Sequence, residues 1–176
     1  MPLITTFSTN VRPDRRLVEV YDSDAYLGSD EAWERSRTQV VAGDGYHLFI
    51  QTSQPDIDVL VTIRVWDTPQ QPPEDAEGTV PVSLESETGQ LVIMQLTFGP
   101  AGEMDLPRPG VYDGHAAWKG REATAASYNP RINHAAEQQG DAGQLGAAWR
   151  QCPTTEQYTL DLWFVRESEP EDDWDA

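Results

Sequence analysis

The sequence predicts an all-β fold, specifically an antiparallel β-sandwich of about seven or eight strands with one short helix. Short runs of alternating apolar residues recur at close spacing, and turn signals rich in glycine and proline separate them. Only one segment carries a clear helix signature. The chain of 176 residues has the length of one domain, which we expect to span residues 1–166. Residues 167–176 hold six acidic residues and no basic one, so we expect a disordered acidic tail.

The strand predictions rest on side-chain alternation, because successive side chains of a strand point to opposite faces of a sheet. Turn-forming polar segments follow residues 52 and 84, so we expect two hairpins, each formed by the strands on either side. Residues 121–128 are expected to continue the sheet. The predicted strands are 17–21, a strand that ends at 41, 46–52, 58–66, 79–84, 90–98, 111–118 and 158–165.

The predicted helix begins at Ser29 or Asp30 and runs through Arg37. Serine and aspartate cap helix N-termini by accepting a backbone hydrogen bond, and two glutamates near the start suit the positive end of the helix dipole. A weaker helical pattern covers residues 142–151. Residues 67–78 hold four prolines or glycines and four acids, which predicts an exposed, mobile loop.

Charge is the strongest compositional signal. The 30 Asp and Glu residues oppose 12 Lys and Arg residues, which gives a formal net charge of -18. Such a field repels nucleic acid and anionic membranes and speeds encounter with a basic molecule. We therefore expect a basic protein partner, no direct nucleic-acid contact and no membrane contact. The single cysteine, Cys152, and the lack of a signal-like N-terminus or a long apolar run predict a cytoplasmic protein.

Residues that carry chemistry are scattered along the sequence. His47, His115 and His134 lack the spacing of a metal or catalytic cluster, so we assign them structural roles, with His47 and His115 on the sheet surface. No phosphate-binding glycine loop, nucleophile elbow or dinucleotide fingerprint is present. The sequence therefore predicts a binding protein, without catalytic residues, metal or cofactor, rather than an enzyme.

A calcium- or ligand-binding sandwich module is the alternative. Calcium takes about six to eight oxygen ligands, and carboxylate-bearing loops of β-sandwich modules supply them. Asp22 with Asp24, and Asp56 with Asp58, form two such Asp-x-Asp pairs. Pairs of this kind arise readily by chance in a chain with 30 acids, so whether they bind calcium stays open at this point.

Carboxylates on a rigid sheet imitate the phosphates of DNA when they approach the same charge density on one face. Acidic residues of the segment 67–105 fall on predicted loops and turns, which suits a contact surface. Aromatic anchors are expected beside them, because binding energy concentrates in Trp, Tyr and Arg. The predicted partner-binding residues are Glu74, Asp75, Glu77, Glu85, Glu87, Glu103 and Asp105, with Tyr26 and Trp33 as aromatic anchors.

Strand motifs at 79–82 (TVPV) and 89–93 (GQLVI) precede 105–112 (DLPRPGVY), a strand ending in Trp118 and the closing strand 158–164. In this order they resemble the competence protein J family, small bacterial β-sandwich inhibitors of a DNA-entry nuclease that also occur as immunity-like proteins. The resemblance covers less than half of the chain. It implies a nuclease or toxin neutralised by a cognate inhibitor. Our leading hypothesis is therefore an acidic cytosolic inhibitor or immunity protein that blocks a basic nuclease or toxin.

Overall fold

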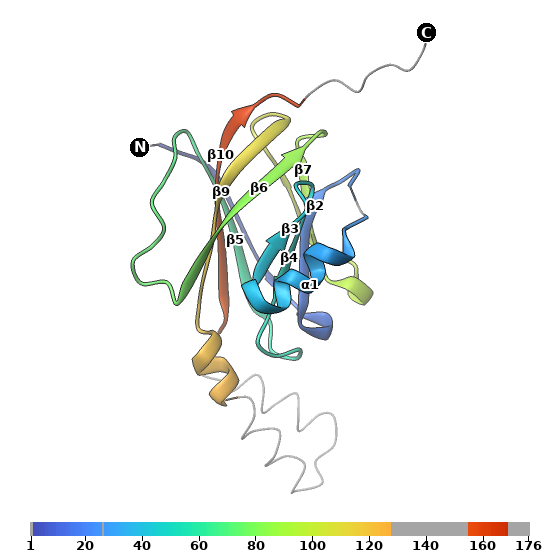
Figure 1. The fold of residues 1–176 in the computed structure, drawn as a ribbon, viewed down its shortest axis with the longest axis vertical. Coiled ribbons are helices and arrows are strands. Elements are labelled where there is room, and N and C mark those ends of the chain that lie inside the picture. The colour runs from blue at the N-terminus through green and yellow to red at the C-terminus, as the bar shows by residue number, and fades with distance from the viewer. Residues whose placement is uncertain (1, 26, 128–154, 169–176) are drawn as a thin grey trace, which may run out of the picture.

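Two five-stranded sheets pack face to face (Figure 1). The computed structural model describes residues 2–25, 27–127 and 155–168. Sheet A has the order β1 (Leu3–Val11), β5 (Val59–Trp66), β10 (Gln157–Arg166), β9 (Gly110–Lys119) and β6 (Gly78–Ser86). Sheet B has the order β3 (Val41–Gly43), β4 (His47–Gln51), β2 (Leu17–Asp22), β7 (Gln90–Met94) and β8 (Pro100–Asp105). The connections contain helix α1 (Asp30–Gln39) and the 3-10 helices η1 (Asp14–Arg16) and η2 (Leu96–Phe98).

The prediction of a mostly β sandwich is confirmed, although the described residues form ten strands. One strand pair is parallel: β10 lies beside β5 with Tyr158 opposite Val61, whereas its other neighbour, β9, is antiparallel. The remaining pairs are antiparallel. In the described residues no helix is long and apolar enough to cross a membrane.

The core lies between the sheets and follows from strand alternation. In β5 the residues Val59, Val61, Ile63 and Val65 are almost completely buried, while the residues between them are partly exposed. Strands β2, β4, β7, β9 and β10 contribute matching inward side chains to the same cluster. Burial of such side chains contributes about 1.5–3 kcal/mol each, so this cluster is the main source of stability.

Both predicted hairpins are wrong. Strand β4 pairs with β2 and β3 in sheet B, while β5 lies in sheet A; likewise β6 lies in sheet A and β7 in sheet B. The two connections cross between the sheets instead of folding back within one. The β4–β5 connection encloses Gln54, whose side chain donates to the Ile57 carbonyl and to the Glu156 carboxylate, both at 2.8 Å. The polar, turn-rich segment after residue 52 therefore forms a crossover between the sheets. The alternation of apolar and polar side chains does not by itself distinguish such a crossover from a hairpin.

Local predictions differ in their outcome. The helix prediction is confirmed: α1 is capped by Ser29, whose hydroxyl accepts from the Ala32 N–H at 3.3 Å. The prediction of a strand over 121–128 is wrong, because residues 121–127 are helical. Gly120, with φ of +81°, ends β9 where it passes close to the backbone of Thr155. The predicted helix at 142–151 lies outside the described residues.

Gly114 explains why the alternation in β9 is imperfect. It faces Leu162 of β10, and a Cβ at this position would collide with the backbone carbonyl of Asp161.

We predict that Gly114→Ala lowers the free energy of unfolding by about 1–3 kcal/mol, because the clash forces two central strands apart. Urea unfolding followed by circular dichroism measures it. Ser83→Ala, on the exposed face of β6, is the control and should stay within about 0.5 kcal/mol of wild type; equal stability of both variants would contradict the close packing.

Candidate protein-interaction site

The turn between β6 and β7 is fixed by a buried carboxylate at the end of β2. Asp22 is 1% exposed and accepts hydrogen bonds from the Ser86 hydroxyl at 2.5 Å, the Thr88 hydroxyl at 2.7 Å and the Thr88 N–H at 3.1 Å. Its second oxygen accepts from the Asp24 N–H at 3.0 Å. Sheet A and sheet B are thereby tied together at this end, and the exposed Glu87 is held on an ordered turn.

The same contacts set the charge state of Asp22. Burial opposes its ionisation, but the hydrogen bonds donated by Ser86, Thr88 and Asp24 outweigh burial and lower the pKa of the carboxyl group. Asp22 is therefore an ionised structural residue, whose acceptor positions are occupied by the turn.

A second turn, between β3 and β4, reaches the same end of the molecule. The Asp44 carboxylate accepts from the N–H groups of Tyr46 and His47, both at 2.9 Å, and from the Ser29 N–H at 3.1 Å. The Gly45 carbonyl then accepts from the Glu85 N–H of β6 at 2.6 Å. This turn of sheet B is therefore fastened to the edge of sheet A.

Tyr46 is presented on that turn beside two of the predicted acids. Its side chain is 45% exposed. A hydrogen bond to Glu85 and the negative charge of that carboxylate raise the pKa of Tyr46, Glu87 adds to the effect, and Arg166 opposes it. The geometry thus combines an exposed aromatic ring with nearby carboxylates on two ordered turns. Five acids with exposed or partly exposed side chains gather here, and we call them the acidic end: Asp24, Asp44, Glu85, Glu87 and Asp105.

Three of the predicted partner-binding acids lie elsewhere. Glu74, Asp75 and Glu77 belong to the connection of residues 67–77, which runs from the end of β5 across the outer face of sheet A to the start of β6. We call this connection the strap. Glu77 accepts from the Gly120 N–H at 2.6 Å, at the start of β6, whereas Glu85 lies at the far end of that strand, about 26 Å away for a nine-residue strand. Glu103 is exposed on β8, two residues from Asp105.

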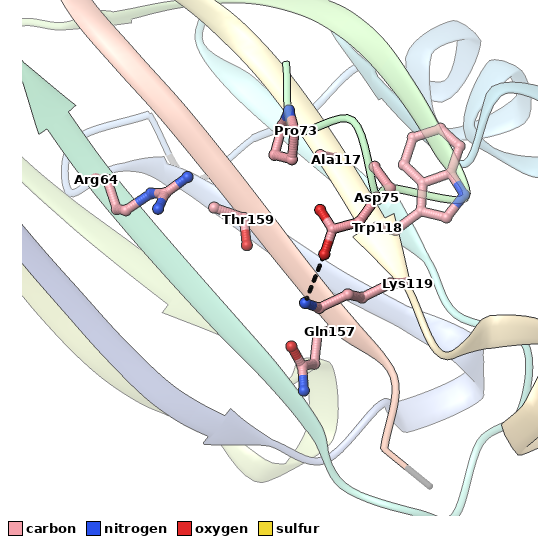
Figure 2. A pocket seen from close by; sticks show the side chains of 9 residues that line it. Arg64, Pro73, Asp75, Ala117, Trp118, Lys119, Gln157 and Thr159 are labelled. Carbon is pink, nitrogen blue, oxygen red and sulfur yellow. Dashed lines mark hydrogen bonds and ion pairs between the residues drawn. The ribbon is translucent and has the colours of Figure 1, made fainter. Parts of the chain in front are cut away.

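Beneath the strap lies a pocket of about 190 Å³ (Figure 2). Thr159 and Ala117 lie on its sheet side, and Arg64 and Lys119 lie at its margins. Lys119 reaches Asp75 of the strap at 3.5 Å, an exposed pair that contributes little to stability. The pocket is small and open, and its two cations are already paired with carboxylates.

A buried polar cluster occupies the outer face of sheet A beside this pocket. Asp161 accepts from Arg64 at 2.7 and 2.9 Å and from the Trp66 indole N–H at 2.7 Å. His115 Nδ1 lies 3.8 Å from Asp161, and Trp163 packs edge-on against the imidazole ring. The prediction that His115 lies on the sheet surface is wrong, because it is 5% exposed.

The prediction that His47 lies on the sheet surface is also wrong, since this residue is fully buried. Its ring stacks between Tyr21 and Phe49 at centroid distances of 4.5 and 4.6 Å. Its nitrogens contact the Glu19 carboxylate at 3.0 Å and the Ala25 carbonyl at 3.3 Å. His47 therefore has a structural role under the segment that leads to α1. His134 and Cys152 lie outside the described residues.

Trp33, one of the two predicted aromatic anchors, does not join the acidic end. Trp33 of α1 is 38% exposed and lines a groove of about 260 Å³ with Leu17, Phe49 and Leu96. Leu17 marks the start of β2, whereas Asp22 marks its end at the acidic end. Tyr26 lies outside the described residues.

The carboxylates proposed for calcium are separated by the fold. Asp22 and Asp24 lie at the end of β2, whereas Asp56 and Asp58 follow β4, whose Gln51 is opposite the start of β2. The two pairs are thus at opposite ends of sheet B, and Asp22 is already saturated with hydrogen bonds. The described residues contain no group of three His, Cys, Asp or Glu side chains arranged to hold a metal ion. The structure gives the calcium alternative no assembled site.

Sequence reasoning missed Asp24 and Asp44 as members of the acidic end, and Tyr46 as the aromatic residue beside it. The Gly43-Asp44-Gly45 run was a visible turn signal. That this turn would meet β6 depends on the pairing of the two sheets, which the local sequence does not contain.

Asp22→Asn tests the anchoring of the β6–β7 turn. We predict a loss of about 1–3 kcal/mol of unfolding free energy at pH 7, because an amide cannot accept at both oxygen positions. Folding lowers the pKa of Asp22, so the ionised carboxylate stabilises the fold at pH values above 3.8, the ordinary pKa of an aspartate. This contribution is lost as the pH falls through the lower pKa of the folded state. Urea unfolding between neutral and acid pH measures the difference, which should shrink at the acid end. Asp24→Asn is the control; a pH-independent deficit for Asp22→Asn would contradict the charged anchor.

Comparison with known proteins places the fold. No protein-family model and no curated protein matches the amino-acid sequence. The crystal structure of ComJ from Bacillus subtilis, an inhibitor of the DNA-degrading activity of NucA, aligns with a TM-score of 0.58 and 10% identity over 93% of this chain and 98% of that chain. A structure described as crocagin biosynthetic gene J aligns with a TM-score of 0.53 and 14% identity over 93% of this chain and 100% of that chain. The chain therefore has a ComJ-like fold, as the motif resemblance implied.

Proposed function

We propose that the chain is an inhibitor that binds a basic protein partner, of the nuclease class, through the acidic end. The observation that carries this proposal is the arrangement of carboxylates around the exposed Tyr46. Asp22 and Asp44 fix the two turns from below, so Glu85, Glu87 and Tyr46 are held before a partner arrives. Preorganised contacts cost less ordering entropy on binding than flexible ones.

Local charge supports a basic partner. The five carboxylates of the acidic end outnumber the cations beside them, which are Arg108, Arg166 and Arg35, whose guanidinium donates to the Gly43 carbonyl next to Asp44 at 2.9 Å. Arg108 is engaged with the Phe164 ring at 3.3 Å from its centroid. Concentrated charge of one sign raises association rates about 10- to 1000-fold at low salt and disfavours partners of the same sign. An anionic substrate such as DNA is disfavoured, while the basic groove of a DNA-binding protein is attracted.

The ComJ-like fold supports the choice of a nuclease. ComJ inhibits the DNA-degrading activity of NucA, and this chain shares its architecture over most of both chains. At 10% identity the shared fold carries no residue assignments, so the acidic end is argued from this chain alone. Together, the fold and the charge favour a non-enzymatic inhibitor that covers a basic active-site groove.

Removal of charge at the two ends of β6 tests which surface binds. The partner is the basic nuclease captured by the tagged wild-type chain from cells of its own host. We predict that Glu85→Gln with Glu87→Gln lowers the association rate about tenfold at low salt, because both carboxylates lie at the contact. Surface plasmon resonance measures the rate, and inhibition of DNA hydrolysis is the functional readout.

The matched variant carries Glu74→Gln with Asp75→Asn on the strap, which removes the same charge at the opposite end of β6. It should associate at nearly the wild-type rate. Both double variants should keep their unfolding free energy within about 1 kcal/mol, because exposed charges contribute little to stability. An equal loss of rate in both variants would show that the acidic end has no special role, and failure of the wild-type chain to inhibit the captured nuclease would remove the proposed function.

Salt provides an independent prediction. We expect the association rate of the wild-type chain to fall steeply between roughly 0.05 and 0.5 M salt, since screening shortens the range of charge interactions from about 14 Å to about 4 Å. The Glu85→Gln, Glu87→Gln variant should show a shallower slope because less charge steers its encounter. Stopped-flow mixing at several salt concentrations measures both slopes, and parallel slopes would argue against steering by these two residues.

A further inference from the structure

Three of the four sheet edges are protected against pairing with another strand. Edge strand β6 contains Pro81, and its Glu85 N–H is occupied by the Gly45 carbonyl. Edge strand β3 has three residues and lies under α1. Edge strand β8 begins with Pro100 and carries Glu103 on its exposed side. Proline, charge and short length are the usual means by which proteins prevent edge-to-edge association.

The fourth edge, β1, has none of these protections. Its nine residues, LITTFSTNV, include no charged residue, proline or glycine, in a chain of which 24% is charged. β-branched and aromatic residues dominate the strand, as suits extended pairing. Leu3 and Ile4 are 43% and 50% exposed. One side of β1 pairs with β5, and its other side has no strand partner in the described structure.

Only part of this edge is open. Near its end, the Thr9 hydroxyl donates to the Ala101 carbonyl of β8 at 3.2 Å, and Phe7 packs against Gly102. Strand β8 therefore reaches the edge of β1 at Thr9, whereas Phe7 meets β8 from the face that points into the sandwich. The open edge consists of residues 3–8, whose outer-face side chains include Thr6 and Ser8, opposite Arg64 and Thr62 of β5.

We propose that residues 3–8 pair antiparallel with the same residues of a second copy of the chain, joining two A sheets into one continuous sheet. The argument for a second copy is electrostatic. Two chains of net charge -18 repel each other over most of their surfaces, and β1 is a long strand without charge, so repulsion is weakest there. Antiparallel pairing of identical strands is also closed by two-fold symmetry, so it ends at a dimer and does not continue into a fibre.

The uncharged edge of β1 suits a second copy of the chain better than it suits a basic partner protein. Charge steering directs such a partner to the acidic end, whereas β1 offers backbone groups and uncharged side chains. The strand pair buries less surface than a standard interface, so we expect a weak dimer, with a dissociation constant of about 10 µM to 1 mM. The proposal is independent of the inhibitor function and is tested on the isolated chain.

Sedimentation velocity over increasing protein concentration tests the dimer. The wild-type chain should shift from monomer to dimer, and Thr6→Lys with Ser8→Lys should weaken association at least about tenfold, because lysines meet their symmetry mates across the strand pair. The control is Thr79→Lys with Ser83→Lys on β6, the opposite edge of the same sheet. It makes the same change of charge and residue type at exposed positions and should dimerise like wild type.

Hydrogen exchange identifies the surface. Amides of residues 3–8 that point away from β5 should become protected as the concentration of the isolated chain rises. A wild-type chain that stays monomeric to about 1 mM would overturn the proposal, as would dimerisation without added protection in β1. Amide protection of β1 that appears only when the captured partner protein is added would assign this edge to that partner. This result would also overturn the proposed dimer. Thermal melts of each lysine variant verify that the fold is intact.

Discussion

Buried carboxylates that fix two of the crossovers between the sheets are the constraint on which this structure depends. Asp22 ties the crossover from β6 to β7 through the hydroxyls of Ser86 and Thr88. Burying a charge is unfavourable unless its hydrogen-bonding positions are filled, so the turn cannot move without exposing or stranding that charge. The acidic composition of the chain is therefore partly architectural, and the exposed carboxylates are displayed on turns that other carboxylates fix.

One further crossover repeats the arrangement. Glu156 is fully buried and accepts from the Ser53 N–H at 2.8 Å, the Gln54 amide at 2.8 Å and the Tyr158 hydroxyl at 2.6 Å, which holds the crossover from β4 to β5. Asp161 is a third buried carboxylate, and because its donors, Arg64 and Trp66, belong to β5, it ties β10 to β5 within sheet A. Sheet A therefore has a covered outer face at its central strands. A sandwich that relies on such ties is rigid at its ends as well as in its core.

The predictable features of this fold are those that depend on neighbouring residues in the sequence. Alternation located most strands, and Ser29 located the start of α1, because both signals act within a few residues. Strand β1 was missed because threonine, serine and asparagine interrupt its apolar side chains. Strand neighbours were also missed, since alternation shows which face is buried but not which strand lies beside it. The burial of His115 and the meeting of Tyr46 with Glu85 depend on the packing of distant segments, so the sequence contains no local sign of them.

The position of β10 has a consequence for how the protein is made. The last strand of the described residues lies in the interior of sheet A, between β5 and β9, both of which precede it in the sequence (Figure 1). Until residues 157–166 leave the ribosome, β5 and β9 have no common neighbour, and the apolar side chains of both sheets lack the cover of Leu160 and Leu162. Contacts between residues so far apart in sequence form slowly. The sandwich is therefore completed only after residues 157–166 have been synthesised, and its decisive folding step brings them between two strands that precede them in the sequence.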